Sequence, residues 1–246
     1  MSASETFASS VSSAILSPSR RLFLRRSTAL TLAGGSAAVL LGASGHNARA
    51  ADTPKETARE GRKAKNQQRD EFESIQKHEA DHVAFLVQAL GASARPKPTF
   101  QNLDQATFPA FVQLAQTLEN TGVGAYLGAA PFISSAEILA AAGSIMTVEA
   151  RHAGYLNSYV NDPLTGNAAD EDADPSFESP LTADQVVAGA GGFIADLNGG
   201  PAVTYSNVAS PENDIAILNF ALALEYLEAE FYDLNVPKFY KARRAT

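Results

Sequence analysis

The sequence predicts an all-α protein, a bundle of four helices joined by one long connector. Three observations lead to this prediction. Helix periodicity dominates four long segments, strand-like alternation is scarce, and each of the four segments carries a carboxylate where an apolar residue is expected. With 246 residues, the chain is long enough to bury one well-packed domain.

Apolar residues that recur at three- and four-residue steps mark each predicted helix. Gly91 ends the first helix, and a Pro-rich connection follows it. Ser135 is the predicted N-cap of the third helix, and the acidic turn that begins at Pro211 favours the start of the fourth. The predicted helices span about residues 55–90, 108–127, 135–160 and 211–234.

Residues 161–212 form a long, acidic and turn-rich stretch between the third and fourth helices. Its one helical pattern, residues 182–197, is weak because Gly189, Gly191 and Gly192 interrupt it. We therefore expect this stretch to be a connector that lies on the surface of the bundle.

The first 50 residues have the pattern of a cleaved export signal. Arg20 and Arg21, with Phe23 two residues on, precede a mildly apolar run over residues 27–44, and small residues flank a cut site at residues 48–50. The run is too short and too rich in Gly to make a stable membrane span. Because the arginine pair resembles the twin-arginine export signal, we expect a periplasmic or extracellular protein that is exported already folded.

Charge and cysteine content exclude several classes of protein. Five Arg and one acidic residue give the first 50 residues a charge of +4, so a chain of net charge −8 leaves −12 for the remainder. This balance argues against a nucleic-acid partner. Because the chain has no cysteine, a metal site must use His and carboxylate ligands.

Each predicted helix places one carboxylate in its apolar stripe, as Glu79 does in the stripe of Ile75 and Leu86. A buried ionised carboxylate destabilises the fold by several kcal/mol unless it is paired or binds a metal. We therefore predict that two divalent ions, Fe or Mn, neutralise four such groups in one core. The four carboxylates are Glu79, Glu119, Glu149 and Glu225.

Two of these carboxylates stand three residues before a histidine, in Glu79-Ala-Asp-His82 and Glu149-Ala-Arg-His152. Residues three apart face the same way on a helix, so the carboxylate can bridge two ions while the imidazole binds one of them. Two helices with this motif and two with a single Glu make up the arrangement of di-iron and di-manganese carboxylate bundles. The predicted ligands are Glu79, His82, Glu119, Glu149, His152 and Glu225.

Four other residues compete for these places or support them. His78, one turn before His82, is expected behind the ligands. Glu228 lies three residues after Glu225 on an overlapping face and is the alternative ligand, although Glu225 is preferred. Tyr126 and Tyr232 are most simply core residues, but Tyr232 lies two turns after Glu225 and can reach the site with a hydrogen bond.

Residues 118–131, 148–153 and 219–232 resemble the ferritin-like domain of desiccation-related proteins. The resemblance extends over most of residues 70–235 and implies a ferritin-like four-helix bundle with the same six ligands. In that family the helix similar to 219–232 comes first, whereas here it comes last, which indicates a circular permutation with helix order B-C-D-A. The connector can span a bundle at about 3 Å per residue, so we expect the last helix to dock in its own chain. If the last helix swapped into a partner chain instead, a dimer would be obligatory, so a homo-oligomer remains an alternative.

The sequence supports two hypotheses of function. The leading one is an exported di-metal protein of redox type, an oxidase, ferroxidase or peroxide-dismutating enzyme that reacts with oxygen or peroxide. The alternative is a non-catalytic bundle that sequesters metal or protects against stress, as the desiccation association of the family implies. A simpler possibility is a bundle without metal, in which the buried carboxyls are protonated.

Overall fold

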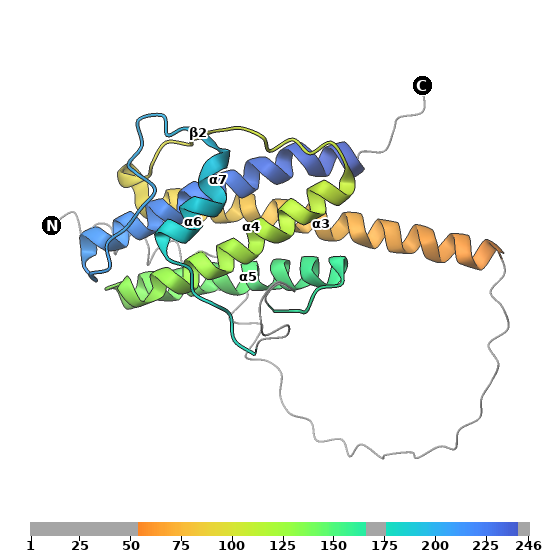
Figure 1. Ribbon diagram of the computed structural model, residues 1–246, viewed down its shortest axis with the longest axis horizontal. Coiled ribbons are helices and arrows are strands. Elements are labelled where there is room, and N and C mark those ends of the chain that lie inside the picture. Colours follow the sequence, from red (N-terminus) through yellow and green to blue (C-terminus); the bar gives the residue numbers. More distant parts are fainter. Residues whose placement is uncertain (1–53, 166–175, 241–246) are drawn as a thin grey trace, which may run out of the picture. The chain divides into compact units, whose positions relative to one another are not determined.

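The computed structural model of the chain describes residues 54–165 and 176–240, so the predicted signal segment lies outside the described residues. Its four long helices are α3 (Pro54–Leu90), α4 (Phe108–Ala129), α5 (Ala136–Val160) and α7 (Pro211–Tyr240). From Glu73 onward α3 belongs to the same compact unit as the other three, and the four pack side by side as a bundle (Figure 1). The predicted all-α bundle is confirmed.

The part of α3 that precedes the bundle, residues 54–72, belongs to a second unit and is helical throughout, with exposed side chains over residues 60–67. Among the described helices, none combines the length and the apolar run that a membrane span requires.

Local sequence signals set the helix boundaries. The Thr107 hydroxyl accepts a hydrogen bond from the backbone N–H of Ala110 at the start of α4, and Ser135 does the same for Ile138 at the start of α5. The predicted N-cap at Ser135 is thus confirmed. Asn161, with φ of 66°, ends α5 in the left-handed conformation that asparagine tolerates.

All four long helices contribute side chains to one apolar cluster at one end of the bundle. Burial of these side chains is the main force that holds the helices together, because exposed helices of this length gain little from propensity alone. The cluster consists of Leu86, Ala89, Leu90, Tyr126, Ile138, Ala141, Ala142, Ile145, Leu218, Ala221 and Leu222.

The last helix is longer than the sequence predicts, because α7 continues past residue 234 to Tyr240 with Pro237 inside it. A proline in a helix removes one backbone hydrogen bond and favours a kink or an end. Aromatic packing holds this last segment in place, since the Phe239 ring lies 5.5 Å from the ring of Phe111 and the Tyr240 ring 5.8 Å from that of Phe108.

The connector lies against the bundle, and a glycine face on α4 receives it. The Leu181 N–H donates to the Gly124 carbonyl at 2.9 Å, and a Cβ at Gly128 would lie 1.9 Å from the Leu181 carbonyl oxygen. Glycine is therefore required there for the close approach of two backbones. Beyond Leu181 the connector forms the short helix α6 (Ala183–Ala190), which a capping box at Thr182 begins.

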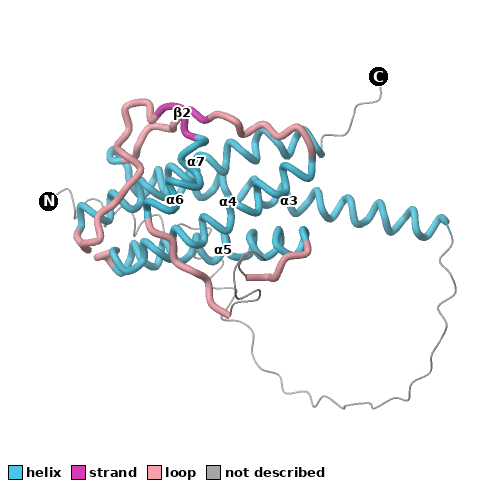
Figure 2. Tube along the Cα trace, viewed as in Figure 1, coloured by secondary structure: helices cyan, strands magenta, loops and turns pink. Residues whose placement is uncertain are grey.

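The connector also forms a small strand pair that the sequence does not predict. β1 (Thr99–Phe100), in the Pro-rich connection, pairs antiparallel with β2 (Ile194–Asp196), which follows α6 (Figure 2). Strands this short have no recognisable pattern of their own and form only because the tertiary fold brings them together.

Candidate metal centre

The six predicted ligands meet in the interior of the bundle. Each is at most 7% exposed, and one or two come from each of α3, α4, α5 and α7. Their ligand atoms form two groups, each with all atoms within 4.8 Å of one another: Glu79, Glu119, Glu149 and His152 in the first, and Glu79, His82, Glu149 and Glu225 in the second. Glu79 and Glu149 belong to both groups, so these two carboxylates can bridge.

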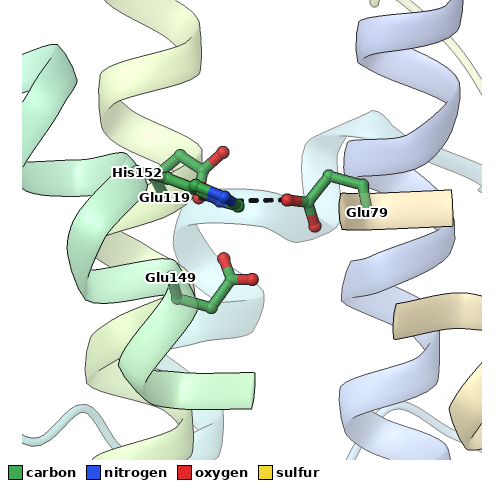
Figure 3. Close-up of side chains that lie close together, drawn as sticks. All are labelled: Glu79, Glu119, Glu149 and His152. Atoms are coloured by element: carbon green, nitrogen blue, oxygen red, sulfur yellow. Dashed lines mark hydrogen bonds and ion pairs between the residues drawn. The ribbon is translucent and has the colours of Figure 1, made fainter. Parts of the chain in front are cut away.

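In the first group His152 faces two carboxylates. Its Nδ1 lies 3.1 Å from Glu79 Oε1 and 3.1 Å from Glu119 Oε2. Figure 3 shows Glu79 approaching from α3 toward His152, Glu119 and Glu149 on the opposite helices. The three carboxylates and the imidazole therefore point into one shared space.

In the second group the Nδ1 of His82 lies 3.3 Å from Glu79, 3.0 Å from Glu149 and 3.2 Å from Glu225. A single N–H can donate well in only one direction, so these short distances do not amount to three hydrogen bonds. Accordingly, none of the four carboxylate oxygens of Glu79 and Glu149 accepts a well-formed hydrogen bond from the described residues.

Unsatisfied buried carboxylates are rare and destabilising, whereas a carboxylate that binds a cation is common in protein interiors. Three carboxylates and one imidazole nitrogen per group are also the oxygen-rich donor set that Fe and Mn accept. The residues present therefore fit divalent cations, which Glu119 and His152 would hold in the first group and Glu225 and His82 in the second, with Glu79 and Glu149 available to both groups.

Burial is the largest influence on the pKa of every ligand for which a shift is resolved. It raises the pKa of Glu149 well above the ordinary value and, with the Glu119 charge, raises the pKa of Glu79 to about 7. Burial alone would lower the pKa of His152, but the charge of Glu119, its hydrogen bond and those of the neighbouring carboxylates together outweigh burial and raise the value to about 11. The pKa of His82 is likewise raised, by Glu225, while His152 lowers that of Glu119. A proton on a ligand atom competes with a metal ion, so metal binding has to displace the protons that the raised pKa values favour.

Two tyrosines hold the terminal carboxylates from behind. The Tyr126 hydroxyl donates to Glu225 Oε1 and the Tyr232 hydroxyl to Glu119 Oε1, both at 2.6 Å. Each tyrosine stands seven residues after the glutamate of its own helix and binds the glutamate of the other helix. The contacts that α4 and α7 make with each other are therefore related by an approximate two-fold axis through the site. Both tyrosines have structural roles near it.

His78 lies behind His152. Its Nδ1 is 3.0 Å from the Nε2 of His152, and the two rings stack with centroids 5.2 Å apart. A hydrogen bond to the far nitrogen fixes the orientation of an imidazole and leaves the near nitrogen for a metal. Burial, followed by the charge of His152, lowers the pKa of His78, so the neutral ring is favoured there.

Glu228 lies outside both ligand groups, although it is only 3% exposed. The structure thus distinguishes the two carboxylates that the sequence leaves as alternatives, and Glu225 is the one that meets the histidine. Glu228 instead faces Gly122 on α4, a residue that sequence reasoning did not single out. The available signal was its position, three residues after Glu119, as Glu228 is three after Glu225.

A family model described as ferritin-like domain matches residues 40–162 and 213–245, which is more than half of the chain. The chain belongs to the ferritin-like domain family. The family model leaves residues 163–212 unmatched, and this stretch corresponds to the connector. No curated protein and no solved structure matches this sequence. The predicted ferritin-like domain is confirmed, while the desiccation-related type and the permuted helix order stay predictions.

Proposed function

We propose that this ferritin-like protein holds two divalent ions, Fe or Mn, and exchanges electrons with oxygen or peroxide at that pair. The observation that carries the proposal is the overlap of two ligand groups that share Glu79 and Glu149. Two shared carboxylates bring two ions close together, and such a pair is the usual basis of two-electron chemistry with small oxidants.

The chain's own residues divide the work at such a site. Glu79 and Glu149 would neutralise both ions at once, so that their negative charge balances the change of metal charge on oxidation. Tyr126 and Tyr232 fix the orientation of the terminal carboxylates by hydrogen bonds. Aliphatic side chains such as Leu222 and Ile145 pack nearby in the core, exclude water and lower the local dielectric.

The proposal includes export by the twin-arginine pathway. This part of the proposal rests on the Arg20-Arg21 pattern alone. A protein that folds before export can take up its metal in the cytoplasm, where folding and metal binding are coupled. A circularly permuted member of the desiccation-related type that acts in oxidative or desiccation stress in the periplasm is consistent with this route.

Elemental analysis of the mature protein from the exported fraction tests the proposal, with a Glu79→Ala/Glu149→Ala double variant beside it. About two Fe or Mn ions per chain, lost in the variant, are expected because each shared carboxylate serves both ions. Absence of metal from both proteins would refute the di-metal assignment.

The redox part of the proposal has its own test. Metal-loaded protein is expected to oxidise added Fe(II) or to consume hydrogen peroxide, whereas the double variant does neither. Retention of two ions without either activity would favour the alternative, a bundle that sequesters metal without turnover.

A further inference from the structure

One buried carboxyl group near the centre has no place in the two ligand groups. Glu228, on α7, is 3% exposed and does not converge with the histidines. A Cβ built at Gly122 would lie 3.5 Å from Glu228 Oε1 and 3.3 Å from Glu149 Oε2. The space that Gly122 leaves free is therefore flanked by Glu228 on one side and by a shared metal ligand on the other.

α4 and α7 occupy corresponding places around the site, but at the corresponding position α4 has a glycine and α7 has a glutamate. The space is therefore present on the α4 side alone. Gly122 follows Glu119 by three residues, and Glu228 follows Glu225 by three. A glycine in the interior of a helix destabilises it by about 1 kcal/mol relative to alanine. An alanine here would make a tight contact with Glu149, so the glycine keeps room between the two carboxylates.

A cavity leads to the same space from the side that α6 covers. It is small, with a volume of about 10 Å³, room for about one water molecule, and is lined by Gly122, Glu228, Ala190 of α6 and three leucines. Thr121, at its edge, is partly exposed, whereas Ala190 is buried. Among the described residues of its walls, only Thr121 and Glu228 have polar side chains, so Glu228 is the carboxylate that anything passing through the cavity meets first.

We propose that this cavity is the entry route for divalent cations and that Glu228 passes each cation to Glu149. The inference rests on the proposed function, because it concerns how the di-metal centre is filled. A cation that leaves water for an apolar cavity needs an oxygen ligand in place of its lost hydration. Glu228 supplies that ligand next to Glu149, whereas a neutral molecule such as oxygen would need no carboxylate on its way.

The charge balance of the interior favours a cation over an anion on this route. Five carboxyl groups stand against the two ligand imidazoles, and each can release its proton to a cation that binds there: Glu79, Glu119, Glu149, Glu225 and Glu228. A cleft of one sign with low-dielectric walls concentrates ions of the opposite sign and speeds their capture. Replacing the Glu228 carboxyl, which becomes negative when it gives up its proton to a cation, should therefore slow metal uptake without removing any of the six predicted ligands.

The test uses the full metal-free chain and Co(II) as the probe, with uptake followed by stopped-flow absorbance and the end point by elemental analysis. Glu228→Gln is expected to slow uptake by about tenfold, the lower end of what charge focusing contributes to capture rates. Glu230→Gln is the matched control, because Glu230 is on the same helix but pairs with Lys97 in a half-exposed ion pair. Its uptake rate should stay within about twofold of the unmodified chain.

A second variant tests the route without altering a carboxylate. Ala190→Leu should slow uptake by narrowing the cavity, and circular dichroism checks that it remains folded. Uptake by Glu228→Gln at the rate of the unmodified chain would overturn the role of Glu228, and unchanged uptake by Ala190→Leu would overturn the route. If the unmodified chain takes up no Co(II) and contains no Fe or Mn, the proposed function fails first and this inference with it.

Discussion

Replacing Glu79 with glutamine should stabilise the metal-free protein and at the same time abolish metal binding. Glu79 is fully buried, and neither of its oxygens accepts a well-formed hydrogen bond from the described residues. Burial, followed by the charge of Glu119, raises its pKa from 4.5 to about 7. A carboxyl whose pKa is higher in the folded state than in the unfolded state lowers the stability of the protein as pH rises from the unfolded-state pKa to the folded-state pKa. For Glu79 this loss of stability is complete above about pH 7.

The size of the effect follows from that pKa. Each unit of pKa corresponds to about 1.4 kcal/mol, so the ionised Glu79 destabilises the metal-free fold by roughly 3 kcal/mol at about pH 8. Glu79→Gln removes this destabilising charge, but part of the resulting stabilisation is lost because a buried amide also needs hydrogen-bond partners. The net stabilisation of Glu79→Gln is therefore about 1–2 kcal/mol, or a rise of roughly 2–8 °C in Tm for a domain of this size.

Thermal unfolding at about pH 8 measures this change, first with chelator present and then with Fe(II) or Mn(II) added under anaerobic conditions. The unmodified chain should gain stability from metal, and Glu79→Gln should gain almost none, because both ions lose a ligand. Glu230→Gln is the control and should shift stability by less than about 1 kcal/mol. A metal-free Glu79→Gln variant that is clearly less stable than the unmodified chain would show that the carboxylate is satisfied without metal, and the argument for the centre would fail.

Three further predictions concern the surroundings of the site. Gly128→Ala should destabilise the fold by more than about 1 kcal/mol in urea unfolding, because its Cβ would lie 1.9 Å from a connector carbonyl, whereas Gly143→Ala, with open space, should be neutral or stabilising. Tyr126→Phe and Tyr232→Phe should each weaken metal affinity by about tenfold in a chelator competition, and unchanged affinity in both would contradict their roles. The pKa of His152 is raised to about 11 and that of the buried Glu149 carboxyl is also raised, so the metal-free folded protein binds more protons than the unfolded chain. Its Tm, measured by thermal unfolding, should therefore fall as pH rises from about 5 to 9.

Sequence pattern alone was sufficient for the four helices and for the convergence of six side chains that are predicted to be ligands, because both depend on which residues share one face of a helix. It could not separate Glu225 from Glu228, which lie three residues apart on one helix and are both buried. Their difference depends on neighbours in the fold, since Glu225 meets His82 at 3.2 Å while Glu228 faces Gly122. The extension of α7 through Pro237 also depends on a tertiary contact, the packing of Phe239 on Phe111.

A site built from helix faces does not depend on the order in which the helices occur in the chain. Each helix presents its ligands through local spacing, as α3 and α5 do with Glu-x-x-His, and only packing brings the faces together. Among the described helices α7 comes last in the sequence, yet its Glu225 carboxylate lies beside His82 of the first long helix. The connector makes this possible by crossing the bundle on the glycine face of α4, where Leu181 contacts Gly124. The connector that links α5 to α7 also supplies Ala190 to the wall of the cavity beside Glu228, so the segment that joins these two helices also covers the proposed entrance to the candidate metal centre.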